Sequence, residues 1–231
     1  MTAEHPTVDP APAATPTLAM IRTLGLVAGI CGLVIVGSYQ GTYDAVAANK
    51  RIAMERAVFH VVPAARSIEA YYALEDGSIA KVEAAAPAGA VRFFAGYDEA
   101  GKLVGVAAEG SAKGYADSVR IMFGYDPACQ CVKNIGLVSM RETPGIGDKI
   151  VKDKQFLANF EQLDAKLNAE MSALANEIKT VKHGAKTAAW QVDAIAGATI
   201  TSRAVGKAIN DTAQALLPKL VPNLDKIKDK S

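Results

Sequence analysis

Hydrophobic residues are concentrated near the start of the chain. Between Asp9 and Asp44 the only charged side chain is Arg22, and residues 23–43 contain none. A helix needs about 20 apolar residues to cross the hydrocarbon layer of a membrane, so this run is long enough. A cleaved signal peptide and a buried core helix are the alternatives, but the run is longer than the apolar part of a signal peptide and begins later. The pattern therefore predicts a retained transmembrane helix over residues 18–43.

The residues after this run have the pattern of a helix that continues out of the membrane. Residues 44–66 contain no helix breaker before Pro63, where a helix is expected to stop. We therefore expect a helical stalk over this segment. Lys50, Arg51 and Arg56 lie within it. Because a large following domain can override the charge rule for orientation, these charges do not decide on which side of the membrane the rest of the chain lies.

From residue 67 onward the pattern becomes typical of short strands. Stretches rich in β-branched and aromatic residues alternate with turn-forming Asp, Gly and Pro residues. The sequences Asp-Gly and Asp-Glu-Ala-Gly predict turns inside the first two stretches, and Asp126-Pro127 predicts a turn between the last two. The strand-forming stretches are residues 67–84, 91–110, 118–126 and 131–142.

After Gly147 the apolar spacing changes to that of a helix. Five apolar residues recur at intervals of four, four, three and four, which places them on one helix face. We therefore predict an amphipathic helix over residues 161–181. A strand over residues 187–195 and a helix that ends before Pro218 follow it. The five residues of the apolar face are Leu163, Leu167, Met171, Leu174 and Ile178.

The composition excludes some classes of protein. The chain has 25 Lys and Arg residues against 24 Asp and Glu residues, a net charge of +1. It therefore lacks the surplus of positive charge that binding to nucleic acid requires. His5, His60 and His183 do not have the spacing of metal ligands with one another or with cysteine, so we expect no metal site. The common phosphate-loop and nucleophile motifs are absent, and we expect no catalytic residue.

Two cysteines, Cys129 and Cys131, form a C-x-C sequence. Such a pair can be oxidised, or can bind a metal ion together with a partner subunit. Two thiolates alone do not complete a zinc or iron–sulfur site. We therefore favour two ordinary cysteines at the end of a strand.

The most distinctive segment, residues 193–202, lies where a strand is expected to lead into a helix. Gly197 and Ala198 remove side-chain bulk where another group must approach the backbone. Three hydroxyl groups lie beside the first turn of the expected helix, where free N–H groups favour an anion such as phosphate. From the residues alone the segment is either a helix cap or a phosphate site. The hydroxyl-bearing residues are Thr199, Thr201 and Ser202.

The same segment resembles the flavinylation motif of the FMN-binding domain family. This family includes the G subunit of Rnf electron-transport complexes and the C subunit of sodium-pumping NADH:quinone oxidoreductases. The matching residues run from Asp193 to Ser202, with Ala196 where the family usually has Ser or Thr. A second block, Glu142-Thr143-Pro144-Gly145-Ile146-Gly147, resembles the E-T-P-G-L-G of the family, and Gly114-Tyr115 resembles a third element. The resemblance covers residues 18 to 217.

This resemblance implies a cofactor and its site. In the family, the threonine at the position of Thr199 carries FMN through a phosphoester bond, which a flavin transferase forms from FAD. The remaining cofactor-binding residues come from the matching blocks, and no metal ligand is implied. These residues are Asp193, Gly197, Ala198, Thr201, Ser202, Glu142, Thr143, Gly145, Ile146, Gly147 and Tyr115.

The resemblance also implies a fold, a location and a role. It predicts an α+β FMN-binding domain over residues 67–217, with a mainly antiparallel sheet flanked by helices. Residues 1–17 are expected to be a cytoplasmic tail and residues 218–231 a C-terminal tail, with the flavin domain on the periplasmic side of the inner membrane. The chain is expected to be a redox subunit of an ion-translocating ferredoxin:NAD oxidoreductase, the Rnf complex, without catalytic activity of its own. Its partners are expected to be the other membrane, iron–sulfur and flavin subunits, the flavin transferase and membrane lipid.

Two alternatives to this role remain open. The first is the C subunit of a sodium-pumping quinone reductase, or a flavin carrier that works outside such a complex. The second is a flavin-free, membrane-tethered assembly or binding domain, in which the motif is only a helix cap.

Overall fold

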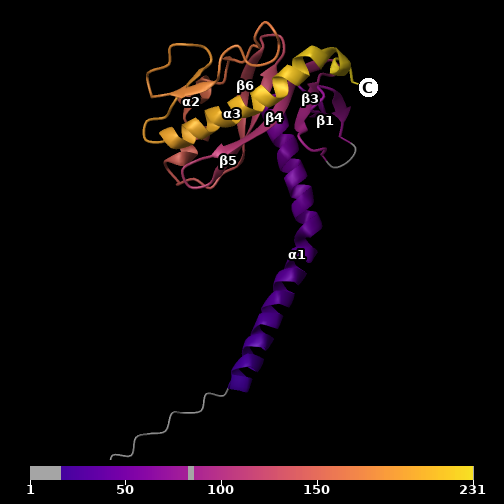
Figure 1. Ribbon diagram of the computed structural model, residues 1–231, viewed down its shortest axis with the longest axis vertical. Coiled ribbons are helices and arrows are strands. Elements are labelled where there is room, and N and C mark those ends of the chain that lie inside the picture. Colours follow the sequence, from indigo (N-terminus) through magenta and orange to yellow (C-terminus); the bar gives the residue numbers. More distant parts are fainter. Residues whose placement is uncertain (1–16, 83–85, 231) are drawn as a thin grey trace, which may run out of the picture. The chain divides into compact units, whose positions relative to one another are not determined.

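A computed structural model describes residues 17–82 and 86–230 of the chain (Figure 1). The chain divides into two compact units, residues 1–50 and 51–231, and each is described by itself. In its described part, the first unit is the N-terminal portion of helix α1 (Thr17–Val61). The C-terminal end of α1 belongs to the second unit, which contains all the strands.

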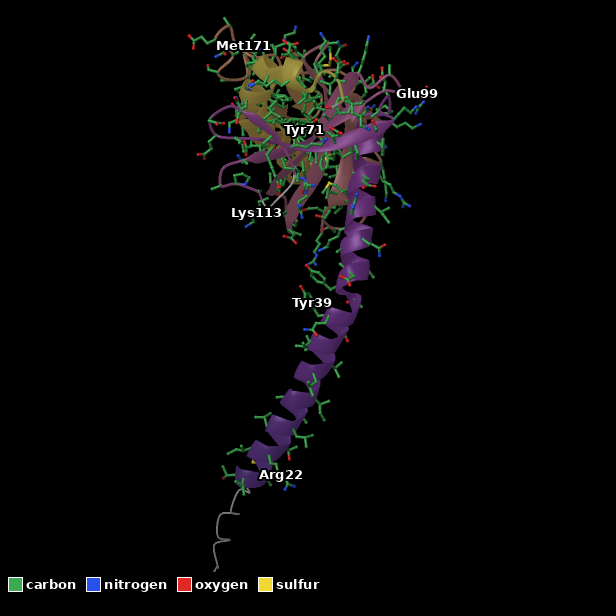
Figure 2. The ribbon with its side chains drawn as sticks, turned by 90° about the vertical axis from the view of Figure 1, so that its right-hand side faces the viewer. Arg22, Tyr39, Tyr71, Glu99, Lys113 and Met171 are labelled. Atoms are coloured by element: carbon green, nitrogen blue, oxygen red, sulfur yellow. A yellow bond between two sulfur atoms is a disulfide. The ribbon has the colours of Figure 1, made fainter. Side chains whose placement is uncertain are left out.

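Helix α1 is long and apolar enough to cross a membrane. Its most apolar 18-residue window has a mean hydropathy of 2.2, and none of this window is buried. The side chains between Arg22 and Tyr39 project outward from the helix (Figure 2). A core helix would bury such a surface, so the exposure favours the membrane span predicted over residues 18–43. The helix ends just before Pro63, where the stalk was expected to stop. The tail expected over residues 1–17 lies outside the described residues, apart from its last residue.

The second unit is built on one antiparallel sheet with the strand order β2-β1-β3-β4-β5-β6-β7. Gly77 and Gly101 adopt positive φ angles of 82° and 77° in the turns after β1 and β3, where the sequence predicts turns. The four strand-forming stretches and the mainly antiparallel α+β fold are therefore confirmed. The strands are β1 (Ser67–Ala73), β2 (Ile79–Lys81), β3 (Val91–Tyr97), β4 (Leu103–Lys113), β5 (Ser118–Asp126), β6 (Cys131–Ser139) and β7 (Leu163–Asp164).

The two faces of the sheet bury different residues because side chains alternate along a strand. On one face, Phe94, Ala107 and Met122 pack against the end of α1, including Val58 and Val61. On the other face, the neighbouring strand positions belong to the larger core that includes the inner surface of helix α3. The sheet therefore has a helix on each face, as the sequence predicts.

Helix α3 (Thr199–Leu220) lies across β4 and β5 (Figure 1). The sequence predicts that this helix ends before Pro218. In the structure it continues to Leu220 and leads into a 3₁₀ helix, η2 (Val221–Ile227). Proline removes one backbone donor from the helix. Leu217 and Leu220 are completely buried on either side of it, and this packing holds the last turn in place.

The segment between β6 and α3 contains only short elements. Besides β7, they are the 3₁₀ helix η1 (Gly147–Val151), helix α2 (Lys154–Ala158), and a parallel pair formed by β8 (Lys179–Val181) and β9 (Gln191–Asp193). The strand predicted over residues 187–195 is therefore present but shorter. It leads directly towards the N-terminus of α3.

The prediction of an amphipathic helix over residues 161–181 is wrong. The Asn168 side chain accepts a hydrogen bond from the backbone N–H of Ser172 at 2.9 Å, and Met171 has a φ of 54°, so the chain makes a tight turn here. Leu174 and Ile178 are nonetheless buried, 6% and 2% exposed. The apolar spacing therefore reflects burial of an irregular segment that a local turn keeps from becoming a helix.

The preference for two ordinary cysteines is also corrected, because Cys129 and Cys131 form a disulfide. Their Cα atoms are 5.2 Å apart, and Gln130 between them has a φ of 52°. The carbonyl of Gln130 accepts a hydrogen bond from the N–H of Ala165. The bond closes the turn between β5 and β6, and the C-x-C spacing alone does not reveal that the two thiols face one another.

Candidate functional site

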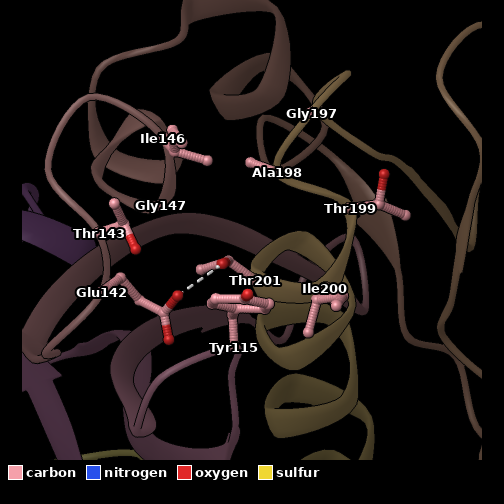
Figure 3. Close-up of a pocket in the computed structure, with 10 residues that line it drawn as sticks. All are labelled: Tyr115, Glu142, Thr143, Ile146, Gly147, Gly197, Ala198, Thr199, Ile200 and Thr201. Atoms are coloured by element: carbon pink, nitrogen blue, oxygen red, sulfur yellow. Dashed lines mark hydrogen bonds between the residues drawn. The ribbon is translucent and has the colours of Figure 1, made fainter.

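The cavity at the N-terminus of α3 has a volume of about 470 Å³ (Figure 3). Three segments that are far apart in the sequence form its walls: the turn after β4, the loop after β6 and the start of α3. Nine of the twelve cofactor-binding residues expected from the sequence line it. The lining residues are Tyr115, Glu142, Thr143, Ile146, Gly147, Gly197, Ala198, Thr199, Ile200 and Thr201.

Glu142 joins the three segments. One carboxylate oxygen accepts a hydrogen bond from the Thr201 hydroxyl at 2.9 Å, and the other accepts one from the N–H of Ala116 at 3.2 Å. Gly114 and Gly147 lie against its side chain so closely that a Cβ at either position would overlap it. The two glycines and two donors therefore fix where this carboxylate lies.

The loop after β6 makes a turn that needs glycine. Gly145 has a φ of 80°, which favours a residue without a side chain, and it is the one residue of the second motif block expected in the site that does not line the cavity. Gly147 begins η1, and Asp148 in this helix pairs with Lys152, the residue that follows the helix, at 2.5 Å. The hydrogen bond from Lys152 holds the pKa of Asp148 below its ordinary value. Glycine at position 145 therefore shapes the loop without touching the cavity.

The first turn of α3 presents unused hydrogen-bonding groups. In the part of the chain that the structure describes, the N–H groups of Thr199, Ile200 and Thr201 make no hydrogen bond, and neither does the Thr199 hydroxyl. Gly197, with a φ of 82°, precedes this turn and has open space beside it. Free N–H groups at the start of a helix favour an anion. The segment is therefore a helix start whose free donors would suit an anion.

Ser202 does not line the cavity, although the sequence placed it in the site. It is completely buried, accepts a hydrogen bond from the N–H of Ile195 at 3.1 Å and donates one to the carbonyl of Ala198 at 2.9 Å. Its hydroxyl thus holds the loop that precedes α3 against the first helical turn. Ser202 supports the site from behind.

Asp193 also lies outside the cavity, beside a neighbouring hollow of about 180 Å³. Its carboxylate accepts a hydrogen bond from the N–H of Gly184 at 2.8 Å and lies 3.5 Å from a ring nitrogen of His183. Its backbone N–H and carbonyl both bond to the side chain of Asn159, which also accepts from Lys186. Burial lowers the pKa of Lys186, and the nearby Asp193 opposes this shift. Asp193 therefore anchors β9 and the loop behind the site.

Three large apolar side chains stand exposed around the cavity. Tyr115, Ile146 and Ile200 are 68%, 50% and 49% exposed, although a folded domain usually buries isoleucine. Sequence reasoning did not select Ile200. The feature that could have identified Ile200 is its position as an apolar residue in the first turn of an amphipathic helix, on the side away from the core. Together these side chains give the cavity an apolar rim.

These features fit FMN. A volume of about 470 Å³ lies within the roughly 300–1,000 Å³ of small-molecule sites, which combine apolar walls with a few polar groups. The apolar rim suits a flat aromatic ring system, and the free N–H groups suit a phosphate. The Thr199 hydroxyl is available for attachment. The described residues contain no cluster of His, Cys, Asp and Glu that could hold a metal ion.

Comparisons with known proteins agree with the cavity and the fold. Residues 114–214 match the profile of the family described as the FMN-binding domain. A stretch of 108 residues is 32% identical to the G subunit of the ion-translocating oxidoreductase complex of Pasteurella multocida, covering 46% of this chain and 48% of that protein. The chain thus matches about half the length of this relative.

Two crystal structures have a similar fold. One is NqrC of Shewanella oneidensis, with a TM-score of 0.61 and 20% identity over 78% of this chain and 99% of the other. The second is the C subunit of the Na⁺-translocating NADH-quinone reductase of Parabacteroides distasonis, with a TM-score of 0.56 and 17% identity over 79% and 96%. At these identities the likeness concerns the fold alone.

Proposed function

Residues 114–214 match the profile of the FMN-binding domain family, and from this match we propose that the chain is a membrane-anchored electron carrier with FMN attached to Thr199. The observation that carries the proposal is the Thr199 hydroxyl, which has no hydrogen bond within the described residues and lies on the wall of a cavity of suitable size. FMN, when bound, exchanges one or two electrons with its partners. The protein supplies a tether and a binding surface.

The residues of the cavity divide this task among them. The free N–H groups of Thr199, Ile200 and Thr201 would hold the phosphate. Gly197, without a side chain, leaves the approach to the attachment point open. The exposed side chains of Ile146 and Ile200 would supply an apolar surface for the flavin ring and help to exclude water from it. The electrons would come from and go to partner subunits, and the chain is proposed to have no catalytic activity of its own.

We further propose that the chain works as a subunit of an Rnf-type ion-translocating oxidoreductase. The 32% identity to the G subunit of an ion-translocating oxidoreductase complex supports this role, as does the apolar helix α1. The partners are the other subunits of that complex and, during maturation, a flavin transferase. The C subunit of a quinone reductase is the second candidate, favoured only by the fold. Copurification of the complete membrane complex, followed by identification of its subunits, distinguishes the two.

The orientation belongs to the same proposal. Residues 1–17 lie in the cytoplasm, α1 crosses the membrane, and the flavin domain faces the periplasm. The disulfide between Cys129 and Cys131 supports this orientation, because disulfides persist in oxidising compartments and are rare in the cytosol. Covalent attachment is useful on that side of the membrane, where a lost cofactor is not readily replaced.

The experiment that tests the proposal is coexpression of the full chain with a flavin transferase, followed by ultraviolet fluorescence of the denatured protein on a gel. We expect fluorescence from the wild type, none from Thr199→Ala, and full fluorescence from the control Thr187→Ala. Thr187 is an exposed threonine outside the cavity lining, and its hydroxyl donates to the side chain of Gln191 at 3.2 Å. A dark wild-type band would leave a flavin-free tethered domain as the better account.

A further inference from the structure

Glu142 is the only charged residue among those that line the cavity in the described part of the chain. The other lining residues are apolar, glycine, threonine and tyrosine. Within the described residues Glu142 takes part in no ion pair. Its negative charge is therefore not cancelled by a neighbouring cation and acts on whatever occupies the cavity.

The position of this charge is fixed by neutral groups. The Thr201 hydroxyl donates to one oxygen and the Ala116 N–H donates to the other, at 2.9 and 3.2 Å. Gly114 and Gly147 pack against the side chain and leave it little freedom to turn. In Figure 3 the carboxylate points towards Thr201 and Tyr115, on the inner wall of the cavity. A carboxylate held in this way stays beside the ligand.

We propose that Glu142 lowers the reduction potential of the flavin attached at this site. The inference rests on the proposed function, because it needs a flavin in the cavity. Reduction adds one or two electrons from the donor to the flavin ring, with any protons taken from solvent, and a fixed negative charge nearby opposes the added negative charge. The opposition is stronger than in bulk water because the protein around the cavity has a lower effective dielectric constant. Glu142 itself gives up no electron and no proton, and acts only through its charge.

The test compares the flavinylated full chain in detergent with its Glu142→Gln variant, by spectroelectrochemical titration at one pH. Glutamine keeps the shape of the side chain and an oxygen that accepts from Ala116. We expect the ratio of reduced to oxidised flavin at a given potential to rise at least tenfold. A tenfold change corresponds to about 59 mV for a one-electron step and about 29.6 mV for a two-electron step.

Asp148→Asn is the matched control. It changes the net charge of the chain by the same amount, at a position in η1 just after the same loop. Asp148 does not line the cavity, and Lys152 already neutralises its charge at 2.5 Å. We expect a change of less than twofold in the same ratio. The comparison separates a charge at the flavin from the overall charge of the domain.

The outcomes distinguish the two proposals. A wild type without attached flavin would overturn the proposed function itself. Attached flavin with equal potentials in wild type and Glu142→Gln, or with equal shifts in Glu142→Gln and Asp148→Asn, would overturn the role of Glu142. If Glu142→Gln accepts no flavin, the variant Thr143→Lys is measured instead. It places a positive charge on the same cavity wall, and we expect its flavin to have a higher reduction potential than in the wild type. An unchanged potential in that variant would also overturn the role.

Discussion

Replacing Gly110 with alanine tests how closely α3 lies on the sheet, which determines where Thr199 stands. A Cβ at Gly110 in β4 would lie 2.5 Å from the carbonyl oxygen of Ala208 and 3.0 Å from the Thr212 hydroxyl. The first obstacle is helix backbone, which moves only with the whole helix. Overpacking of this kind destabilises the folded state by about 1–3 kcal/mol. Alanine is less flexible than glycine in the unfolded chain, and this difference stabilises the folded state by roughly 0.5–1 kcal/mol. We expect a net loss of about 1–2 kcal/mol.

The assay is thermal unfolding of the full chain in detergent, followed by the fluorescence of Trp190, the only tryptophan in the sequence. In a domain of this size, 1 kcal/mol lowers the melting temperature by about 2–4 °C. Gly110→Ala should therefore melt roughly 2–8 °C below the wild type. Far-ultraviolet circular dichroism at low temperature checks that both proteins are folded before the comparison is made.

Gly136→Ala serves as the control for this measurement. Gly136 lies in β6, and a Cβ there would make only ordinary contacts, 3.4 Å from His60 and 3.5 Å from Val61. This variant should be as stable as the wild type or slightly more stable. Equal melting temperatures for Gly110→Ala and Gly136→Ala would refute the close packing of α3 against β4.

The remaining predictions concern the site and the disulfide. Ser202→Ala leaves the buried N–H of Ile195 without its acceptor and should cost about 1–3 kcal/mol, measured by the same unfolding assay; full stability would contradict the supporting role of Ser202. Ile200→Ser should leave the melting temperature unchanged. It should increase the quenching of attached-flavin fluorescence by iodide, because the flavin ring loses an apolar cover. Unchanged quenching would place the ring elsewhere. Maleimide labelling of the denatured protein should modify one cysteine before reduction and three after it, whereas labelling of all three before reduction would exclude a bond between Cys129 and Cys131.

The strands were predictable because their signals are local. Turn residues such as Asp76-Gly77 and those from Asp98 to Gly101 separate apolar stretches, and the structure places turns at these positions. The long apolar run was equally clear from its lack of charge. In both cases the residues that decide the structure are neighbours in the sequence.

The site was predictable only through its motif blocks. Periodicity alone does not bring Glu142 next to Thr201, since 59 residues separate them and the hydrogen bond depends on the packing of α3. The resemblance to a family supplied this proximity. It did not distinguish residues that face the cavity, such as Thr201, from Ser202 and Asp193, which support the site from behind.

The errors in the sequence predictions have a common physical cause, which is packing between distant segments. The regular spacing of apolar residues over 161–181 resulted from burial of a looped segment, and the turn at Asn168 prevented a helix. Helix α3 passed Pro218 because leucines on both sides of it are buried. Ile200 was overlooked because its importance lies in its exposure beside the cavity, which the sequence does not reveal.

The central claim is that FMN is bonded to Thr199, and peptide mapping tests it most directly. Trypsin cleavage after Lys186 and Arg203 releases residues 187–203, a peptide with four hydroxyl-bearing residues. Tandem mass spectrometry of this peptide, from the full chain coexpressed with a flavin transferase, should show the mass of FMN minus water on Thr199. An unmodified peptide, or FMN on Thr187, Thr201 or Ser202, would contradict the account.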